Sequence, residues 1–153
     1  MANYYDIMEP ILEHFRVQVE ATVPLGDNMP DFEFFESELD LVGNANRERL
    51  FDVQIDKDEP PGLPNLYGAG TVDYEVPVNI DISYLDLKAN TAAAYNDLEN
   101  IREKIRLSDT SALTGYEVSW VRDPNVVWLP SNDETTKYRY MRIPYMVRIK
   151  VTH

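Results

Sequence analysis

Two segments of the sequence alternate apolar and polar residues over an unusual length, and they constrain the fold more than any other feature. Such a period of two is typical of a β-strand with one buried face. At about 3.3 Å per residue, the first segment would span about 43 Å. Its apolar positions are Val72, Tyr74, Val76, Val78, Ile80, Ile82 and Tyr84, and those of the second are Met141, Ile143, Tyr145, Val147, Ile149 and Val151.

Each long segment carries a proline among its polar positions, Pro77 in the first and Pro144 in the second. Proline has no backbone N–H to donate to the ladder of a sheet. We therefore expect a bend, a bulge or an edge position at Pro77.

Other segments predict two helices and shorter strands. Apolar residues recur at helical spacing over roughly 3–20 and 90–107, and shorter alternating stretches lie at 51–55 and at 116–120, the latter followed by 126–129. Because each long strand has one apolar side, both helices are expected to cover a single face of one sheet. The predicted fold is α+β: one mixed or antiparallel sheet of about four main strands, two helices on one face and long loops, in a single domain over 1–153.

The charge of the chain is strongly negative and unevenly distributed. The net charge is −13, and the chain has no cysteine. Most of the acidic excess lies before residue 61, whereas the stretch 137–153 has five bases and no acid. Nucleic-acid binding favours a concentrated basic surface, so this balance argues against it. Without cysteine, disulfides, thiolate nucleophiles and cysteine zinc sites are excluded. No signal peptide or membrane-spanning segment is predicted, so we expect a soluble protein made in the cytoplasm.

Searches for catalytic and cofactor motifs give nothing that fits. The two histidines, His14 and His153, are too few to form a histidine-based acid–base or metal cluster. Gly68 and Gly70 begin like a dinucleotide loop, but a strand follows where phosphate binding needs a helix. The acidic run 56–59 lacks the glycine and the final glutamate of a calcium loop. The sequence therefore predicts neither an enzyme nor a cofactor or metal site.

Two long connections and one strand face supply the candidate partner contacts. The connections 22–46 and 57–71 are too long for passive links in a compact domain, and their apolar side chains either fold back over the core or reach a partner. Basic and aromatic residues also share the polar face of the last strand. The candidate interface residues are Phe32, Phe34, Phe35, Leu66, Tyr67, Tyr138, Tyr140, Arg142, Arg148 and Lys150.

The order of these segments resembles the tail terminator proteins of long-tailed bacteriophages. The resemblance covers the helix at 7–19, the strand at 51–55, the Pro/Gly loop, the long strand ending at Tyr84, the helix at 90–107 and the last strand. It implies a structural virion protein, without cofactor, that forms a hexameric ring capping the tail tube. The implied partners are further copies of the chain, the tail tube protein and a head–neck connector protein, and DNA would pass through without specific binding.

Two other interpretations remain open. Neck and head-completion proteins of the same virions share much of this element order. The acidic N-terminal part is also compatible with a small inhibitor or immunity protein that blocks a basic partner.

Overall fold

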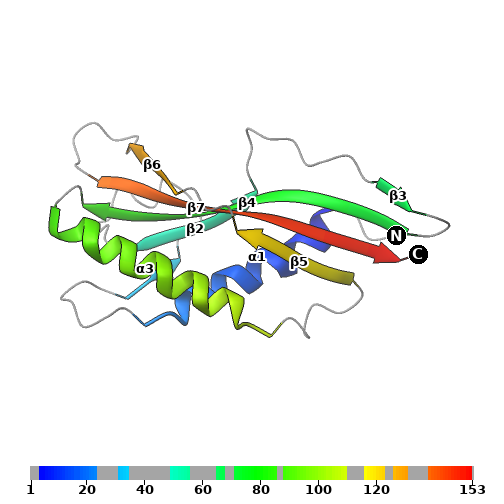
Figure 1. Ribbon diagram of the computed structural model, residues 1–153, viewed down its shortest axis with the longest axis horizontal. Helices are drawn as coiled ribbons and strands as arrows, with labels where there is room; N and C mark the ends of the chain where they lie inside the picture. Colours follow the sequence, from blue (N-terminus) through cyan, green and yellow to red (C-terminus); the bar gives the residue numbers. More distant parts are fainter. Residues whose placement is uncertain are drawn as a thin grey trace.

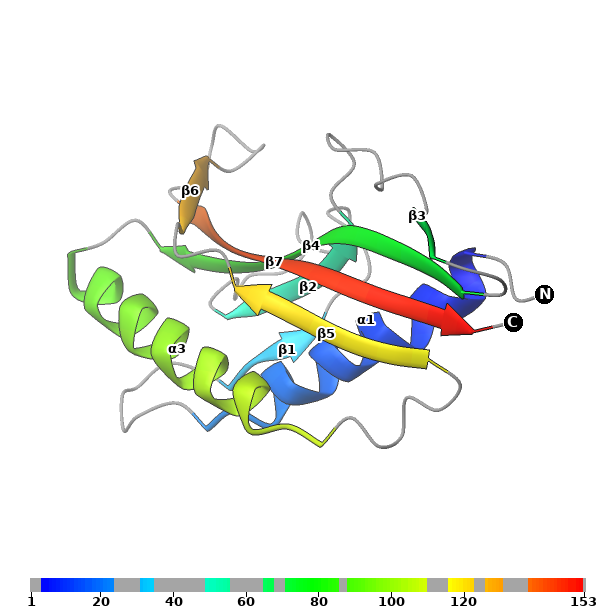
Figure 2. The same cartoon turned by 45° about the vertical axis from the view of Figure 1, so that its right-hand side comes forward.

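The computed structural model describes residues 4–23, 31–34, 49–55, 65–67, 71–85, 88–109, 116–122, 126–130 and 138–152. Two helices lie on the same side of one twisted sheet (Figures 1 and 2). The elements are α1 (Tyr4–Glu20), β1 (Glu33–Phe34), β2 (Leu50–Ile55), β3 (Asn65–Tyr67), β4 (Thr71–Leu85), α3 (Lys88–Arg106), β5 (Tyr116–Arg122), β6 (Val127–Pro130) and β7 (Tyr138–Thr152).

The sheet has the main path β1-β2-β4-β7-β5, with β3 paired to β4 and β6 paired to β7. All pairings are antiparallel except that of β1 with β2. The predicted α+β class, with one mixed sheet and two helices on one face, is therefore confirmed. The four main predicted strands correspond to β2, β4, β5 and β7. β1 and β3 were not predicted because segments of two or three residues are too short to show a period.

The two long strands are neighbours and pair one-to-one from Thr71↔Thr152 to Leu85↔Tyr138. Pro77 lies between the part of β4 that pairs with β3 (71–73) and the part that pairs with β2 (78–82). Pro144 likewise falls between the parts of β7 that pair with β6 and with β5. A residue without an N–H is best tolerated where the partner on one side changes. Both prolines therefore sit within continuous central strands, and the pairing with β7 passes Pro77 without a bulge.

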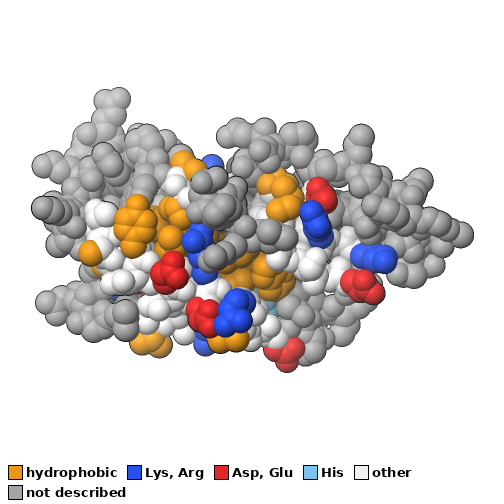
Figure 3. Space-filling view, in the orientation of Figure 1, with side chains coloured by type: hydrophobic (Ala, Val, Ile, Leu, Met, Phe, Trp, Pro, Cys, Tyr) orange, Lys and Arg blue, Asp and Glu red, His pale blue; other side chains and the backbone are white. Residues whose placement is uncertain are grey.

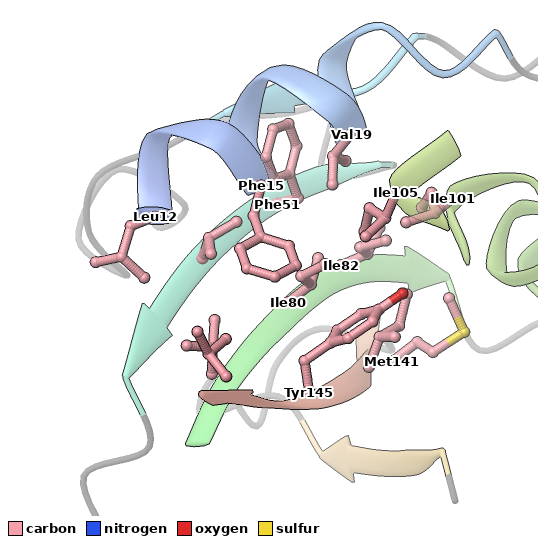
Figure 4. Packing of buried hydrophobic residues seen from close by; sticks show 14 of the residues in the cluster. Leu12, Phe15, Val19, Phe51, Ile80, Ile82, Ile101, Ile105, Met141 and Tyr145 are labelled. Carbon is pink, nitrogen blue, oxygen red and sulfur yellow. The ribbon is translucent and has the colours of Figure 1, made fainter. Parts of the chain in front are cut away.

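One buried cluster joins the helices to the inner face of the sheet. The stripe of α1 contributes Ile11, Phe15 and Val19 to this cluster. Figure 4 shows Phe15 and Val19 lying over the sheet. The predicted inward positions of β4 from Val76 to Tyr84, and those of β7 from Met141 to Ile149, are all buried. At about 1.5–3 kcal/mol for each large apolar side chain, this burial is the main source of stability. No helix in the described ranges is both long and apolar enough to cross a membrane.

Candidate functional site: the polar face and a buried ion pair

The polar face of the sheet carries charges that are paired across strands. Arg142 on β7 donates to the carboxylate of Asp81 on β4 through Nε (2.9 Å to Oδ1) and Nη2 (3.1 Å to Oδ2). Gln54 on β2 donates to the same carboxylate from Nε2, at 3.2 Å. Towards the other end of the strands, Arg148 Nε lies 3.4 Å from Glu75 Oε1. Register explains both pairs, because Asp81 faces Arg142 and Glu75 faces Arg148.

This face is exposed only in part. Asn79, Asp81 and Ser83 in β4 are buried, whereas Arg148 and Lys150 are exposed. In Figure 3, acidic and basic side chains of the described residues lie next to one another on the side turned to the viewer. The described charged side chains in that view therefore form neighbouring pairs of opposite sign.

The candidate interface residues of β7 differ in how accessible their side chains are. Tyr140 is half-buried and packs against Leu50, and Arg142 is held by Asp81. Arg148 and Lys150 remain accessible to a partner. The backbone of Tyr138 pairs with Leu85, but its side chain lies outside the described residues.

The candidate residues of the two long connections are less available than expected. Phe32 is buried in the core, so it folds back over its own domain and does not reach a partner. Phe34 is half-buried, with its ring 5.7 Å from that of Phe51 and 4.8 Å from the guanidinium of Arg16. Phe35 lies outside the described residues. The backbones of Leu66 and Tyr67 form part of β3, and their side chains are not described.

A buried ion pair, which the sequence did not predict, joins the start of β2 to α3. Arg49 donates to Asp97 through Nε (2.7 Å) and Nη2 (3.0 Å), and the two side chains are 0% and 1% exposed. Tyr84 at the end of β4 donates its hydroxyl to the same carboxylate at 2.7 Å. Burial raises the pKa of Tyr84 well above its ordinary value, and the charge of Asp97 raises it further, so the phenol stays protonated and keeps donating.

The backbone of Arg49 is also held in place. Its φ of 56° lies in the left-handed region that is uncommon for residues other than glycine. Its N–H donates to the carbonyl of Ser83 at 2.8 Å, and its carbonyl accepts from the N–H of Glu33 at 3.1 Å. Arg49 therefore connects β1, β4 and α3 at the point where the chain enters β2.

The chemistry of this cluster is structural. Asp97 accepts hydrogen bonds from Arg49 and Tyr84 inside the core, so its carboxylate is not exposed to a substrate. Among the residues that the structure describes, no group of three or more histidine, aspartate or glutamate side chains could hold a metal ion. One sequence signal could have revealed the cluster: Asp97 falls on the apolar stripe of α3, between Ala94 and Ile101.

His14 on α1 occupies a second polar position beside the core. Its Nε2 lies 2.9 Å from Ser108 Oγ, and that hydroxyl donates to the carbonyl of Ile105, so His14 is the donor. Its ring centroid is 5.4 Å from that of Trp120. Burial lowers the pKa of His14, and the charge of Asp109 offsets part of this effect.

The lowered pKa makes a prediction about acid stability. The stabilising contribution of neutral His14 is present above the ordinary pKa of 6.5 and is lost as the pH falls through the lowered value. His14→Gln can keep a hydrogen bond to Ser108 but cannot titrate. The melting temperature of the wild type should therefore fall more than that of His14→Gln between about pH 7.5 and pH 5. Equal falls in the two proteins would contradict the assignment.

Comparisons with known proteins do not assign this chain to a family. The chain matches no protein-family model and no curated protein.

Proposed function

We propose that this chain is a structural protein of a bacteriophage virion, which forms a homo-oligomeric ring, caps the tail tube and offers a docking surface to the head. The observation that carries the proposal is the order of the main elements. When the three shortest strands (β1, β3 and β6) are left out, the chain runs helix, strand, long strand, helix, strand, long strand. The resemblance to tail terminators rests on this order.

The surface chemistry is compatible with such a role. The helices cover one face of the sheet, and the opposite face presents Arg148 and Lys150 as accessible bases near the end of β7. These two side chains could dock on an acidic surface of a partner. The net charge of −13 would repel DNA that passes through the ring and would not retain it.

The proposal can be tested with purified protein and tail tubes assembled without a terminator. Negative-stain images should show a ring at one end of each tube, and tubes alone should end without it. Rings that bind heads but never tubes would instead indicate a neck or head-completion protein. A protein that stays monomeric and binds neither would reject the proposal and favour the inhibitor interpretation.

Inverting the charge of Arg148 should weaken docking while leaving the fold intact. Arg148→Glu places a second carboxylate opposite Glu75 on an exposed part of the sheet, where ion pairs contribute at most about 1 kcal/mol. We expect little change in melting temperature but weaker binding to tubes or heads, measured by co-sedimentation. Unchanged binding would remove Arg148 from the docking surface.

The charge-swapped variant Glu75→Arg/Arg148→Glu is the matched control. It restores an ion pair between the two strands but still inverts the charge at position 148. If Arg148 contacts a partner, the swap should leave docking weak. Recovered docking would show that the single variant acted through repulsion from Glu75.

A further inference from the structure

One edge of the sheet is a long strand without the usual protection. β5 pairs with β7 over all seven of its residues, one-to-one and without a bulge, and among the described strands it pairs with no other. Exposed edges are normally protected by shortness, proline, lysine or a bulge. The segment Tyr116–Arg122 contains no proline, glycine or lysine. Its two charged residues, Glu117 and Arg122, lie towards its ends, and Val118, Trp120 and Val121 lie between them. Its outer side therefore has the composition of a strand suited to pairing with another strand.

The opposite edge is also incompletely covered. β1 pairs with β2 only at Leu50 and Phe51. In the part of the chain that the structure describes, no strand pairs with Val53, Gln54 or Ile55 on that outer side. Among the described strands, both edges of the sheet therefore have backbone groups that no neighbouring strand pairs with.

The hydrophobic core is open at the same two edges. The apolar side chains of the central strands are almost fully buried, whereas several at the periphery are only partly buried. Ile55 and Phe34 belong to the β2 edge, and Val118 and Trp120 belong to the β5 edge. Each edge would bury more apolar surface if another strand, with apolar side chains on the helix side of the sheet, were added beside it.

We propose that the β5 edge of one copy pairs with the β2 edge of the next copy. This inference rests on the proposed ring and names the contact between its subunits. Because β2 and β7 run in the same direction and β5 runs opposite to them, copies placed side by side with their helices on one face bring β5 and β2 together antiparallel. Antiparallel pairing is the more stable arrangement.

A specific register satisfies both faces of this junction. With Val118 opposite Ile55, Trp120 falls opposite Val53 on the helix side of the sheet. Ser119 then falls opposite Gln54 on the polar side, so the three pairs formed by Val53, Gln54 and Ile55 place no like charges opposite each other. Pairs of aliphatic and aromatic residues across strands are stabilising, so the junction continues the core from one copy to the next.

The two edges differ, so the contact is heterologous. Each added copy covers one edge of its neighbour and leaves its own other edge free, which builds a ring when the rotation between copies closes. Pairing of β5 with β5 of a second copy would instead stop at a dimer and would leave both β2 edges open.

The test uses one lysine variant for each edge. Lysine at an edge disfavours strand addition, while its long side chain can still reach water in the free chain. Val118→Lys and Ile55→Lys should each convert the wild-type oligomer to monomer in sedimentation velocity. Val118→Thr and Ile55→Thr, which keep a β-branched side chain, serve as matched controls and should still assemble. Circular dichroism melting checks that each variant is folded before it is mixed, and a lysine variant that does not fold is replaced by glutamate at the same position.

Mixing the two lysine variants is the decisive step. Val118→Lys keeps its β2 edge and Ile55→Lys keeps its β5 edge, so a 1:1 mixture should form a heterodimer and nothing larger. A homodimer of Ile55→Lys alone would indicate β5–β5 pairing and overturn the proposal. It would also be overturned by a monomeric wild type, by lysine variants that assemble like the wild type, or by a mixture that stays monomeric. Tube binding, measured separately, tells whether the proposed function fails as well.

Discussion

Asp97→Asn is expected to lower the free energy of unfolding by about 3–5 kcal/mol, although the side chain keeps nearly the same shape. The cause is the guanidinium of Arg49, which is fully buried and would lose its counter-charge. The hydroxyl of Tyr84 would also lose a charged acceptor. Chemical denaturation followed by circular dichroism measures the change. A loss below about 1 kcal/mol would contradict the buried geometry.

Arg148→Gln is the control for this prediction. It also removes one partner of an ion pair, but both side chains of that pair are at least half exposed. Water screens and solvates the remaining Glu75, so the expected change stays within about 1 kcal/mol. The contrast between the two variants isolates burial as the cause.

Replacing the whole cluster tests the same explanation from the other direction. The triple variant Arg49→Met/Asp97→Leu/Tyr84→Phe removes both charges and the hydroxyl together, so none of these three groups remains buried after losing the other two. Apolar replacement of a buried ion pair is often neutral or stabilising. The triple variant should therefore be more stable than Asp97→Asn alone. If it were as unstable as the single variant, poor packing and not an unpaired charge would be the reason.

Regular periods made most of the fold predictable. The alternation in β4 and β7 continues for many residues, so the buried face of each strand is specified many times over. The stripe of α1 repeats Ile11, Phe15 and Val19 at four-residue spacing, and all three are buried. The structural setting of the two prolines could not be predicted. A strand tolerates proline best where a neighbouring strand ends, and the ends of neighbouring strands depend on the whole sheet and not on the segment that contains the proline.

The buried ion pair escaped prediction for a similar reason. Arg49 precedes a strand, in a segment without a period, and lies 48 positions from Asp97. Only the packing of α3 against the sheet brings the two together. Asp97 gave a local signal, a carboxylate on an apolar stripe, but the stripe alone cannot name the partner.

The candidate interface residues show the difference between predicting the side of a strand and predicting its contacts. Alternation placed Arg142, Arg148 and Lys150 on the same side of β7, which the structure confirms. It could not show that Asp81 already holds Arg142, because that contact depends on how β4 and β7 align. Nor could it show that Phe32 folds back into the core, because the surrounding segment has no repeating pattern.

Val147→Asp is expected to leave the domain unfolded at room temperature. Val147 is fully buried in β7, and Val76 faces it on β4. A carboxylate there would have no described basic neighbour on the inner face, and burying an unpaired charge costs several kcal/mol. Because whole domains are stable by only about 5–15 kcal/mol, one such charge at the centre of the sheet removes much of that margin. Circular dichroism melting measures the effect.

Two controls separate charge from size and from position. Val147→Ala removes volume without adding charge, so its melting temperature should fall by less. Ser119→Asp adds the same carboxylate to the same sheet, but on the exposed face and opposite Arg148, so it should melt like the wild type. If Val147→Asp kept a normal melting temperature, β7 would have to present its odd-numbered residues to solvent. The polar face that carries Arg148, and the subunit contact inferred from the same sheet, would then both be assigned to the wrong side.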